Sequence, residues 1–377
     1  MAETTTSYRT CLFCEATCGI EVTLRDSEIV KIRGDKDDPF SRGYICPKAY
    51  GLKGLHEDPD RLTAPVKRTE NGWEEISWSE AYALAIDGLT RVRDDHGAQA
   101  LGTYLGNPNA HNMHTLLYGP FLQRSLGTKQ RFSATSADQL PKQLTADLMF
   151  GGSLNIPIPD VDRTQFFLIL GANPMVSNGS LMTAPNLPKR LKEIRERGGR
   201  IVVIDPRRTE TAAIADAHHF IRPGGDAFLL LGMIHVLFRD ERAALGALAN
   251  HVEGVEAVRE AVASFTPERM SARCGIDASV IESLAHEFAD ADAAVCYGRL
   301  GTTCQEFGTV SSWAVDVLNT LTGNLDRPGG AMFVDAAVKS RSLRPPKPSR
   351  VKFDRWRSRV DNLPEAFGEL PVAVLPN

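Results

Sequence analysis

The chain has 377 residues, 42% of them hydrophobic and 24% charged, which is ordinary for a globular protein with a sizeable core and two or three domains. A net charge of −4 and an isoelectric point near 6.2 indicate no strongly basic surface, so no nucleic-acid partner is expected. The sequence has no long apolar run and no N-terminal leader, which predicts a cytoplasmic protein without a direct membrane span.

The first elements along the chain are predicted to be a hairpin, a helix and a strand. Residues 20–25 and 28–33 alternate apolar and polar side chains around a two-residue turn, which is typical of a β-hairpin. Residues 77–95 carry apolar side chains at helical spacing after a capping sequence, and residues 100–106 are typical of a buried strand. Near the other end, the basic and proline-rich residues 339–352 are predicted to be a linker.

From about residue 165, strands and helices are predicted to alternate. Apolar runs predict strands at residues 166–170, 200–204, 219–222 and 293–297. Helices are predicted at about residues 185–197 and 226–239. This alternation predicts a parallel sheet covered by helices, with ligands bound at the carboxyl ends of the strands. Four short loops would lie at that edge, namely residues 171–174, 205–207, 223–226 and 298–301.

Four of the seven cysteines lie near the N-terminus, which indicates a metal site in a reducing compartment and not a disulfide framework. Cys11, Cys14 and Cys18 lie within eight residues, and Cys46 follows after 27 more. Thiolates bind iron–sulfur clusters or zinc, and zinc sites favour paired Cys-x2-Cys arms. A triplet with a remote fourth cysteine favours a 4Fe-4S cluster, with zinc and no metal as the alternatives. The other three cysteines are predicted to be small, buried apolar residues.

Seven distinctive segments occur in order along the chain. They are residues 11–22 (CLFCEATCGIEV), 43–49 (GYICPKA), 58–66 (DPDRLTAPV), 73–81 (WEEISWSEA), 171–174 (GANP), 204–212 (IDPRRTETA) and 321–330 (LTGNLDRPGG). Together they resemble the dimethyl sulfoxide reductase family of molybdopterin oxidoreductases, which includes formate dehydrogenases and assimilatory nitrate reductases. The resemblance covers about residues 8–335, and several ordered motifs are far more specific than one.

The resemblance implies an α/β fold like domains 1–3 of formate dehydrogenase and dimethyl sulfoxide reductase, including a doubly wound parallel sheet. Residues 1–58 would form a small β-rich iron–sulfur domain. Residues 59–138 and 326–377 would form a discontinuous α/β domain near the metal, and residues 139–325 would bind molybdopterin guanine dinucleotide. Family members usually continue for several hundred residues, so the discontinuous domain is expected to be truncated.

The same resemblance implies a 4Fe-4S cluster and a molybdenum or tungsten ion held by two molybdopterin guanine dinucleotides. The residues expected to bind the dinucleotide are Gly171, Ala172, Asn173, Asp205, Pro206, Arg207, Gly225, Asp226, Gly298 and Gly301. Small residues let a backbone approach a phosphate closely, and Asn173 and Asp205 offer hydrogen-bonding groups. The alternatives are a strand-ending turn at Asp205 and a plain helix cap at Asp226.

The thiolate that usually binds the metal in formate dehydrogenases of this family has no counterpart, since no cysteine occurs between residues 47 and 273. The equivalent position falls near residues 136–138. Asp138 is the first candidate for the ligand and Ser136 the second, and a metal without a side-chain ligand is the third alternative. Both residues also suit a helix cap in a polar loop.

Three further residues are candidates for the site. Lys48, which follows the last cluster cysteine by two residues, is implied by the resemblance to lie between cluster and pterin and to assist electron passage. The alternative for Lys48 is an ordinary surface lysine. His111 and His114 are candidates for the lining of the pterin or substrate pocket, with a position at a helix end as the alternative.

The implied function is a two-electron oxidation or reduction of a small substrate at molybdenum or tungsten, with electrons passed through the cluster. The implied partner is a redox protein or an electron-transfer subunit. Two alternatives belong to other classes: a pterin-free iron–sulfur scaffold, as in the large iron–sulfur subunit of respiratory complex I, and a non-redox hydratase of the same family. The loops at residues 171–174 and 204–212 argue against the scaffold.

Overall fold

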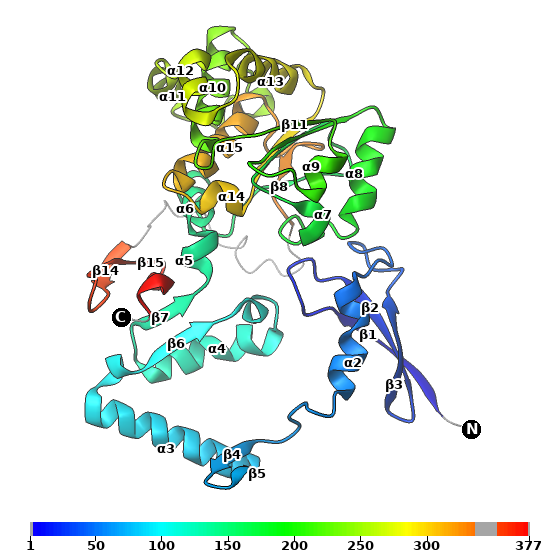
Figure 1. The fold of residues 1–377 in the computed structure, drawn as a ribbon, viewed down its shortest axis with the longest axis vertical. Helices are drawn as coiled ribbons and strands as arrows, with labels where there is room; N and C mark the ends of the chain where they lie inside the picture. The colour runs from blue at the N-terminus through cyan, green and yellow to red at the C-terminus, as the bar shows by residue number, and fades with distance from the viewer. Residues whose placement is uncertain (1–2, 336–352, 376–377) are drawn as a thin grey trace. The chain divides into compact units, whose positions relative to one another are not determined.

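The chain divides into two compact units (Figure 1). The computed structural model describes residues 3–335 and 353–375. The first unit comprises Met1–Ser136 and Lys352–Asn377, and the second comprises Ala137–Val351. The predicted linker at residues 339–352 lies outside the described residues.

The first unit begins with a three-stranded antiparallel sheet in the order β1-β2-β3. The predicted hairpin is confirmed as β2 (Gly19–Arg25) and β3 (Glu28–Gly34), joined by Asp26 and Ser27 at φ 49° and 72°. Positive φ at both turn residues gives the twist that suits a tight hairpin. The polar strand β1 (Thr4–Thr10) has no apolar alternation that would have predicted it. Two short helices follow the sheet, α1 (Pro47–Tyr50) and α2 (Leu52–Glu57).

The two long helices of the first unit lack a buried face. α3 (Trp78–His96) begins where predicted, and the Ser77 hydroxyl accepts a 3.2 Å hydrogen bond from the Glu80 amide. Within the described chain, neither α3 nor α4 (Met113–Leu126) contains a buried residue. The large exposed apolar residues of α4 are Met113, Leu116, Leu117, Tyr118, Phe121 and Leu122. Short helices in water depend on packing of such a face for most of their stability.

The strands between and after these helices form two-stranded sheets. β6 (Gly102–Leu105) pairs in parallel with β7 (Gln130–Ser133). The strand predicted at residues 100–106 is therefore confirmed, but its predicted burial is wrong, because β6 has a single partner strand and is half exposed. The remaining elements of the unit are β4 (Val66–Thr69), β5 (Gly72–Glu75), η1 (Ala98–Ala100), η2 (Asn107–Ala110), β14 (Phe353–Arg357), β15 (Pro364–Ala366) and η4 (Val372–Val374).

The second unit contains the predicted parallel sheet, with strand order β11-β10-β9-β12. Its strands are β9 (Phe166–Leu170), β10 (Arg200–Ile204), β11 (Ala217–His219) and β12 (Ala294–Gly298). Three of the four strands lie where predicted, but β11 ends where the strand predicted at residues 219–222 was to begin. Every residue of the central strand β9 is buried, as expected for a strand covered on both faces.

Successive residues of β9 and β10 point into two different cores. Leu168 and Val202 pack on one face against α10 (Asp226–Arg239), whereas Phe167 and Val203 pack on the other face with α8 (Leu187–Glu196). The sheet therefore has helices on both faces, which confirms the α/β fold class (Figure 1). The other helices of the unit are α5 (Thr135–Asp138, shared with the first unit), α6 (Leu140–Phe150), α7 (Pro174–Ser177), α9 (Glu210–Ile214), η3 (Gly246–Leu248), α11 (Val255–Val262), α12 (Pro267–Cys274), α13 (Ala278–Asp290), α14 (Leu300–Thr303) and α15 (Gly308–Leu321). The short strands β8 (Ile158–Pro159) and β13 (Ala331–Met332) pair antiparallel.

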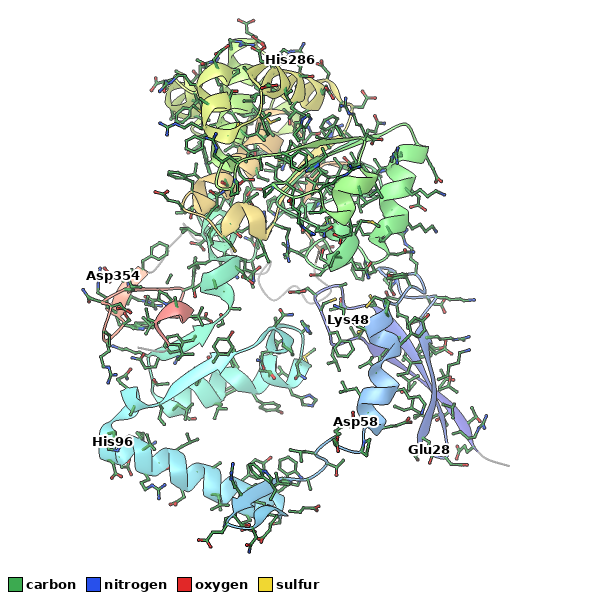
Figure 2. All side chains as sticks on the ribbon, viewed as in Figure 1. Glu28, Lys48, Asp58, His96, His286 and Asp354 are labelled. Carbon is green, nitrogen blue, oxygen red and sulfur yellow. The ribbon has the colours of Figure 1, made fainter. Side chains whose placement is uncertain are left out.

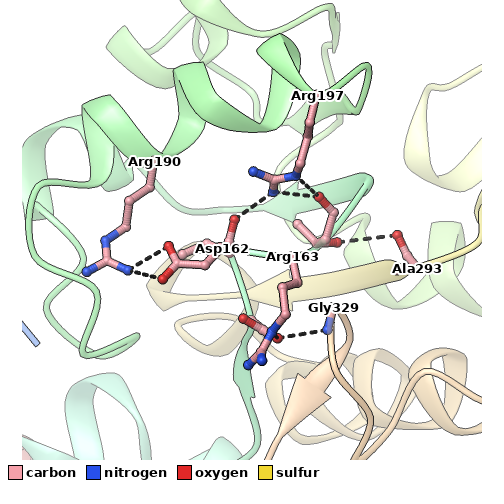
Figure 3. Close-up of polar contacts among 9 residues, drawn as sticks. Asp162, Arg163, Arg190, Arg197, Ala293 and Gly329 are labelled. Atoms are coloured by element: carbon pink, nitrogen blue, oxygen red, sulfur yellow. Dashed lines mark hydrogen bonds and ion pairs between the residues drawn. The ribbon is translucent and has the colours of Figure 1, made fainter. Parts of the chain in front are cut away.

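An ion-pair network holds the loop that enters β9 (Figure 3). Arg190 Nη1 donates to both carboxylate oxygens of Asp162 at 2.6 and 2.7 Å. Arg197 donates to the backbone carbonyls of Val161 and Thr164. Arg190 within α8 and Arg197 at its C-terminal end therefore contact the same loop. Burial of the Arg197 guanidinium lowers its pKa.

Replacing Arg190 by methionine is expected to destabilise the second unit by about 2 kcal/mol, because the partly buried Asp162 carboxylate loses a charged donor. The Arg190 side chain is 11% exposed and that of Asp162 32%, so solvent screens part of the pair. The control is Lys189→Met, which removes an exposed ion pair with Glu193 and should change stability by less than about 0.5 kcal/mol. Denaturant unfolding followed by circular dichroism measures both, and equal losses would contradict the expectation.

Candidate functional site

The four N-terminal cysteines gather around one small apolar core of the first unit. Cys11 follows β1, Cys18 precedes β2, and the Cys11 amide donates a 2.8 Å hydrogen bond to the Cys18 carbonyl. Both side chains are buried, at 6% and 7% exposure, and Cys14 packs against the same core. Cys46 is the N-cap residue of α1, whose first turn brings it to this core beside Ile45.

Burial and mutual repulsion disfavour thiolates at this place. Burial raises the pKa of the Cys11 thiol, and it raises the pKa of Cys18 to about 12. The charges of Cys11, Cys14 and Cys46 contribute part of this rise at Cys18, so the four thiols lie within electrostatic reach of one another. Four thiolates here therefore need a positive centre, which an iron–sulfur cluster supplies.

Lys48 lies on α1, next to the antiparallel sheet (Figure 2). Its ammonium group lowers the pKa of Cys11, so it lies within electrostatic reach of the cysteines, although its side chain is exposed. Among the described residues, no three histidine, cysteine or acidic side chains are spaced to hold a single metal ion. A cubane cluster differs from a single ion because each thiolate binds a different iron atom, so its ligands are spread more widely.

At the carboxyl edge of the sheet in the second unit, two of the predicted loops touch through glycine. A Cβ atom placed on Gly171 would lie 2.7 Å from the Cα of Gly301, and one on Gly301 would lie 2.6 Å from the Cα of Gly171. The Gly301 amide donates a 3.0 Å hydrogen bond to the Gly171 carbonyl. Gly171 also has φ +53°, which favours glycine. These glycines are therefore needed for the contact between β9 and β12 loops, whatever ligand the loops bind.

The other two predicted glycines are also restricted by the protein itself. A Cβ on Gly225 would lie 2.8 Å from the Arg222 carbonyl oxygen and 2.9 Å from the Cα of Cys274. A Cβ on Gly298 would lie 2.8 Å from the Thr302 hydroxyl. Gly225 and Gly298 were predicted to contact the cofactor, and close packing within the protein is a separate reason for glycine at both positions.

The Asn173 side chain joins the first loop to the second. Its Nδ2 donates to Glu210 Oε2 at 2.6 Å, and its Oδ1 accepts from the Thr211 hydroxyl at 2.8 Å. The Thr211 hydroxyl accepts in turn from the Met175 amide at 3.1 Å. Asn173 thereby fixes the backbone that carries the neighbouring Ala172, which is itself buried.

The second loop is a tight polar turn. Asp205 follows β10 and is 9% exposed, and its Oδ1 accepts a 2.8 Å hydrogen bond from the Arg207 amide across Pro206. The Asp205 carbonyl contacts His218 Nε2 at 3.0 Å. One carboxylate oxygen of Asp205 therefore takes part in a strand-ending turn, which was the alternative to a cofactor contact. The Arg207 side chain is exposed at the same edge.

Asp226 opens α10 at the same edge and is 4% exposed. Its Oδ2 accepts a 3.1 Å hydrogen bond from Gln305 Nε2, which also contacts the Ser311 hydroxyl at 3.1 Å. The Oε1 atom of Gln305 is buried without a hydrogen-bond partner in the described chain. A carboxyl group and an amide oxygen side by side can recognise the N–H groups of a purine base. Gln305 was not predicted from the sequence.

Burial raises the pKa of the Asp226 carboxyl group to about 6, against about 3.9 in an unfolded chain. Because the folded pKa is the higher, the group contributes its full stability below about pH 4 and loses it as pH rises through about 6. Two pKa units correspond to about 3 kcal/mol. We expect Asp226→Asn to flatten this part of the stability profile and to raise stability at pH 7. Denaturant unfolding from pH 4 to 8 measures it, and an unchanged profile would refute the assignment.

The segment proposed to hold the metal, α5, spans the boundary between the units. In the first unit, the Ser136 hydroxyl accepts a 2.8 Å hydrogen bond from the Val372 amide. That contact uses one lone pair of the second candidate ligand.

In the second unit, the backbone of the first candidate ligand is held by the C-terminal end of α14. The Asp138 carbonyl accepts a 2.5 Å hydrogen bond from the Thr303 hydroxyl. The neighbouring Ala137 carbonyl accepts one from Cys304 Sγ at 3.2 Å. The Asp138 side chain is half-buried. The candidate ligand and a thiol from residue 304 therefore meet, although no sequence pattern links them.

The position of Cys304 corrects a prediction. Cys274 and Cys296 are buried as expected, and burial raises the pKa of both thiols. Cys304 was predicted to be buried as well and is exposed. The reason is its position in the loop between α14 and α15, where no apolar periodicity directs its side chain inward.

The two histidine candidates of the first unit differ from each other. His114 is exposed on the first turn of α4. His111 follows η2, and both of its ring nitrogens are buried without a hydrogen-bond partner among the described residues. A buried imidazole with no partner is uncommon, so His111 is the stronger candidate for a ligand contact.

Comparisons with known proteins define the class to which this site belongs. Residues 61–344 match the molybdopterin oxidoreductase family, and residues 4–55 match the molybdopterin oxidoreductase Fe4S4 domain. The chain therefore belongs to the molybdopterin oxidoreductase family. Its cofactors are a 4Fe-4S cluster and molybdopterin guanine dinucleotide with molybdenum or tungsten, as the gathered thiols and the sheet-edge loops allow.

Individual relatives in this family act on different substrates. The chain is 26% identical over 321 residues to the F420-dependent formate dehydrogenase subunit alpha of Methanocaldococcus jannaschii, covering 85% of the chain and 46% of that protein. It is 28% identical over 341 residues to the thiosulfate reductase molybdopterin-containing subunit PhsA of Salmonella typhimurium, covering 87% and 42%. The chain spans about half the length of the relatives it matches.

A solved structure supports the fold independently. Acetylene hydratase from Pelobacter acetylenicus superposes with a TM-score of 0.70 at 24% identity, over 84% of this chain and 43% of that one. At this identity the likeness supports the fold alone. In the described part of the chain, no helix is long and apolar enough to cross a membrane.

Proposed function

We propose that the protein carries out a two-electron oxidation or reduction of a small substrate at a molybdenum or tungsten centre, and exchanges the electrons through its 4Fe-4S cluster. The observation that carries the proposal is the presence of two sites in one chain. One is a group of four cysteines whose thiolate charges repel one another, and the other is a sheet edge with four loops. The implied partner is a redox protein or an electron-transfer subunit. The cytoplasmic location stays a prediction.

The chain's own residues have distinct tasks in this proposal. Cys11, Cys14, Cys18 and Cys46 ligate the cluster, and Lys48 offsets the negative charge that the cluster gains on reduction. The dinucleotide would be held by the sheet-edge loops, with hydrogen bonds from or to Asn173, Asp205, Pro206, Arg207 and Asp226, and with close backbone approach at Gly171, Ala172, Gly225, Gly298 and Gly301. When bound, the pterin and metal supply the two-electron chemistry.

Asp138 is the side chain that we propose as metal ligand. A carboxylate oxygen suits a high-valent, oxophilic metal, and its backbone is held on the second unit by the Thr303 contact. Ser136 is the second choice, because its hydroxyl already accepts from the Val372 amide.

The domain arrangement is also a proposal. Residues 1–58 are taken as the cluster domain and 139–325 as the dinucleotide-binding domain. The remaining residues, 59–138 and 326–377, would form part of a domain whose apolar helix faces are covered by polypeptide outside the described residues. The supporting observation is that α3 and α4 have no buried residue within the described chain.

Hydrogen–deuterium exchange of the 377-residue chain tests this domain proposal. We expect α3 and α4 to exchange within seconds, because few tertiary contacts oppose their opening. Amides of β9 and α10 should be protected, since every residue of β9 and eleven of the fourteen residues of α10 are buried. Protection of α3 equal to that of β9 would show that the helix is packed without a further segment.

The function itself is tested by metal analysis and spectroscopy on protein purified without oxygen. About four irons with sulfide and about one molybdenum or tungsten per chain are expected. A viologen dye that reports electron transfer with candidate small substrates then separates the redox reaction from hydration. Iron and sulfide without molybdenum, tungsten or extractable pterin would contradict the proposal and favour a scaffold subunit.

A second candidate function is the non-redox hydratase that the family resemblance of the seven segments also allows. In that case the site would add water to a substrate without net electron transfer. Product formation with no reduction or oxidation of the dye would favour this candidate over the redox enzyme.

A further inference from the structure

Three polar side chains of the second unit are buried in the contact between α6 and α15. Lys142 of α6 is 5% exposed, and Asp316 and Ser312 of α15 are 3% and 1% exposed. Lysine and aspartate are seldom buried to this degree unless they are paired. Ser312 and Asp316 lie four residues apart, so they share one face of α15.

These groups interact through charge. Burial raises the pKa of the Asp316 carboxyl group to about 6, and the nearby Lys142 ammonium opposes that rise. Lys142 and Asp316 also act in opposite directions on the pKa of the Cys296 thiol on β12, so both lie close to the middle of that strand. The Ser312 hydroxyl is buried without a hydrogen-bond partner in the described chain. The charged face of α6 is thus held against α15 and β12 in a region of low dielectric.

Lys142 and Asp316 each lie on a helix that follows a segment in contact with the candidate ligand. Lys142 lies in the first turn of α6, four residues after Asp138. Asp316 lies on α15, which begins four residues after Cys304. The Thr303 hydroxyl and the Cys304 thiol donate to the Asp138 and Ala137 carbonyls, and so join the end of α14 to α5, the segments that precede these two helices.

The same two segments are therefore joined twice. The outer connection is a pair of hydrogen bonds from Thr303 and Cys304 at the end of α14, and the inner one is the packing of α6 on α15, which buries both Lys142 and Asp316. A third contact, from the Thr145 hydroxyl to the Thr309 carbonyl at 3.3 Å, lies between the same helices. With both ends held, the backbone at residues 137–138 has little freedom to shift relative to the sheet edge.

We propose that Lys142 and Asp316 are positioning residues for the Asp138 segment, and that they set its placement for ligation of the metal. This inference deepens the proposed function and rests on Asp138 as the ligand. Neither residue is proposed to touch substrate, cofactor or metal. Opposite charges buried on two packed helices suit this role, because a shift of one helix would leave a buried charge without its compensating neighbour, which is strongly destabilising.

Lys142→Met tests the proposal, because it keeps the length of the side chain and removes its charge. The first readout, which needs no metal, is hydrogen–deuterium exchange of the peptide containing residues 133–142. We expect exchange there to rise at least about fivefold in the variant. The second readout is the electron paramagnetic resonance spectrum of the metal(V) state, whose g-values report the metal's ligands and should shift.

Arg190→Met is the matched control. It also removes a partly buried cation from the second unit, and it should lower the melting temperature without changing either readout. The double variant Lys142→Met with Asp316→Leu should recover the melting temperature lost in the single variant, because no unpaired charge stays buried. Its metal(V) spectrum should stay altered.

Each failure has its own signature. Unchanged exchange at residues 133–142 in Lys142→Met would overturn the positioning role. Changed exchange with an unchanged metal(V) spectrum would keep the helix contact and overturn its link to the metal. Wild-type protein that contains neither molybdenum nor tungsten would instead contradict the proposed function, and the exchange readout would still decide the contact.

Discussion

Replacing Cys18 by serine is expected to remove the 4Fe-4S cluster, leaving about three irons per chain or fewer instead of about four. Cys18 is buried beside Cys11, and the pKa of its thiol is raised to about 12 without a positive centre. A serine hydroxyl is a far weaker acid than a thiol, and its oxygen is a harder ligand than sulfur, so it cannot replace the buried thiolate. Electron exchange with a dye should fall with the cluster, because the proposed route for electrons passes through it.

The matched control for this prediction is Cys274→Ala. Cys274 is also a buried thiol, but it lies in the core of the second unit and behaves as a small apolar residue. Iron and sulfide analysis with spectra of the reduced protein, purified without oxygen, compares the two variants. Full iron content in Cys18→Ser would sink the assignment, and iron loss in both variants would point to general unfolding.

The second large effect is expected at the contact between the β9 and β12 loops. Gly171→Ala would place a methyl group 2.7 Å from the Cα of Gly301, at a residue with φ +53°. The close contact is with backbone, so the two loops must separate. We expect destabilisation of about 3 kcal/mol or more, together with loss of bound pterin, because both loops belong to the proposed dinucleotide site.

Gly198→Ala separates strain from collision. Gly198 has a similar positive φ of +83°, but a Cβ there would meet nothing within 4 Å. Its substitution should destabilise the protein by only about 1 kcal/mol and leave the pterin content unchanged. Denaturant unfolding and release of the pterin on acid treatment measure the two effects. Similar losses in both variants would mean that backbone strain alone matters at Gly171.

Much of the local structure could be predicted because its cause lies within a few residues of sequence. The alternation around Asp26 predicted the hairpin, Ser77 predicted the start of α3, and the apolar runs predicted β9 and β10. The cysteine spacing indicated a cluster site because three of its ligands are neighbours in the chain. Each of these features is decided by local periodicity, capping or spacing, so no knowledge of the fold is needed.

Contacts between distant residues were decided only by the tertiary structure. Gly171 and Gly301 touch because β12 pairs with β9 after a long helical excursion, and sequence spacing does not determine that strand order. Lys142 and Asp316 are both buried for the same reason, because α6 and α15 pack together although they are far apart in the sequence. Charged side chains are seldom buried to this degree, so their local sequence does not predict it.

The sequence by itself indicated the family, predicted four cysteines as cluster ligands and predicted the alternation of strands and helices from about residue 165. The tertiary structure decided which loops meet, which thiol is exposed, and which apolar helix faces are left uncovered. The Cys304 thiol contacts the backbone carbonyls of Ala137 and Asp138. Within the described chain, α3 and α4 bury no residue. The physical reason is that secondary structure depends on near neighbours, whereas burial and side-chain partners depend on how distant segments pack.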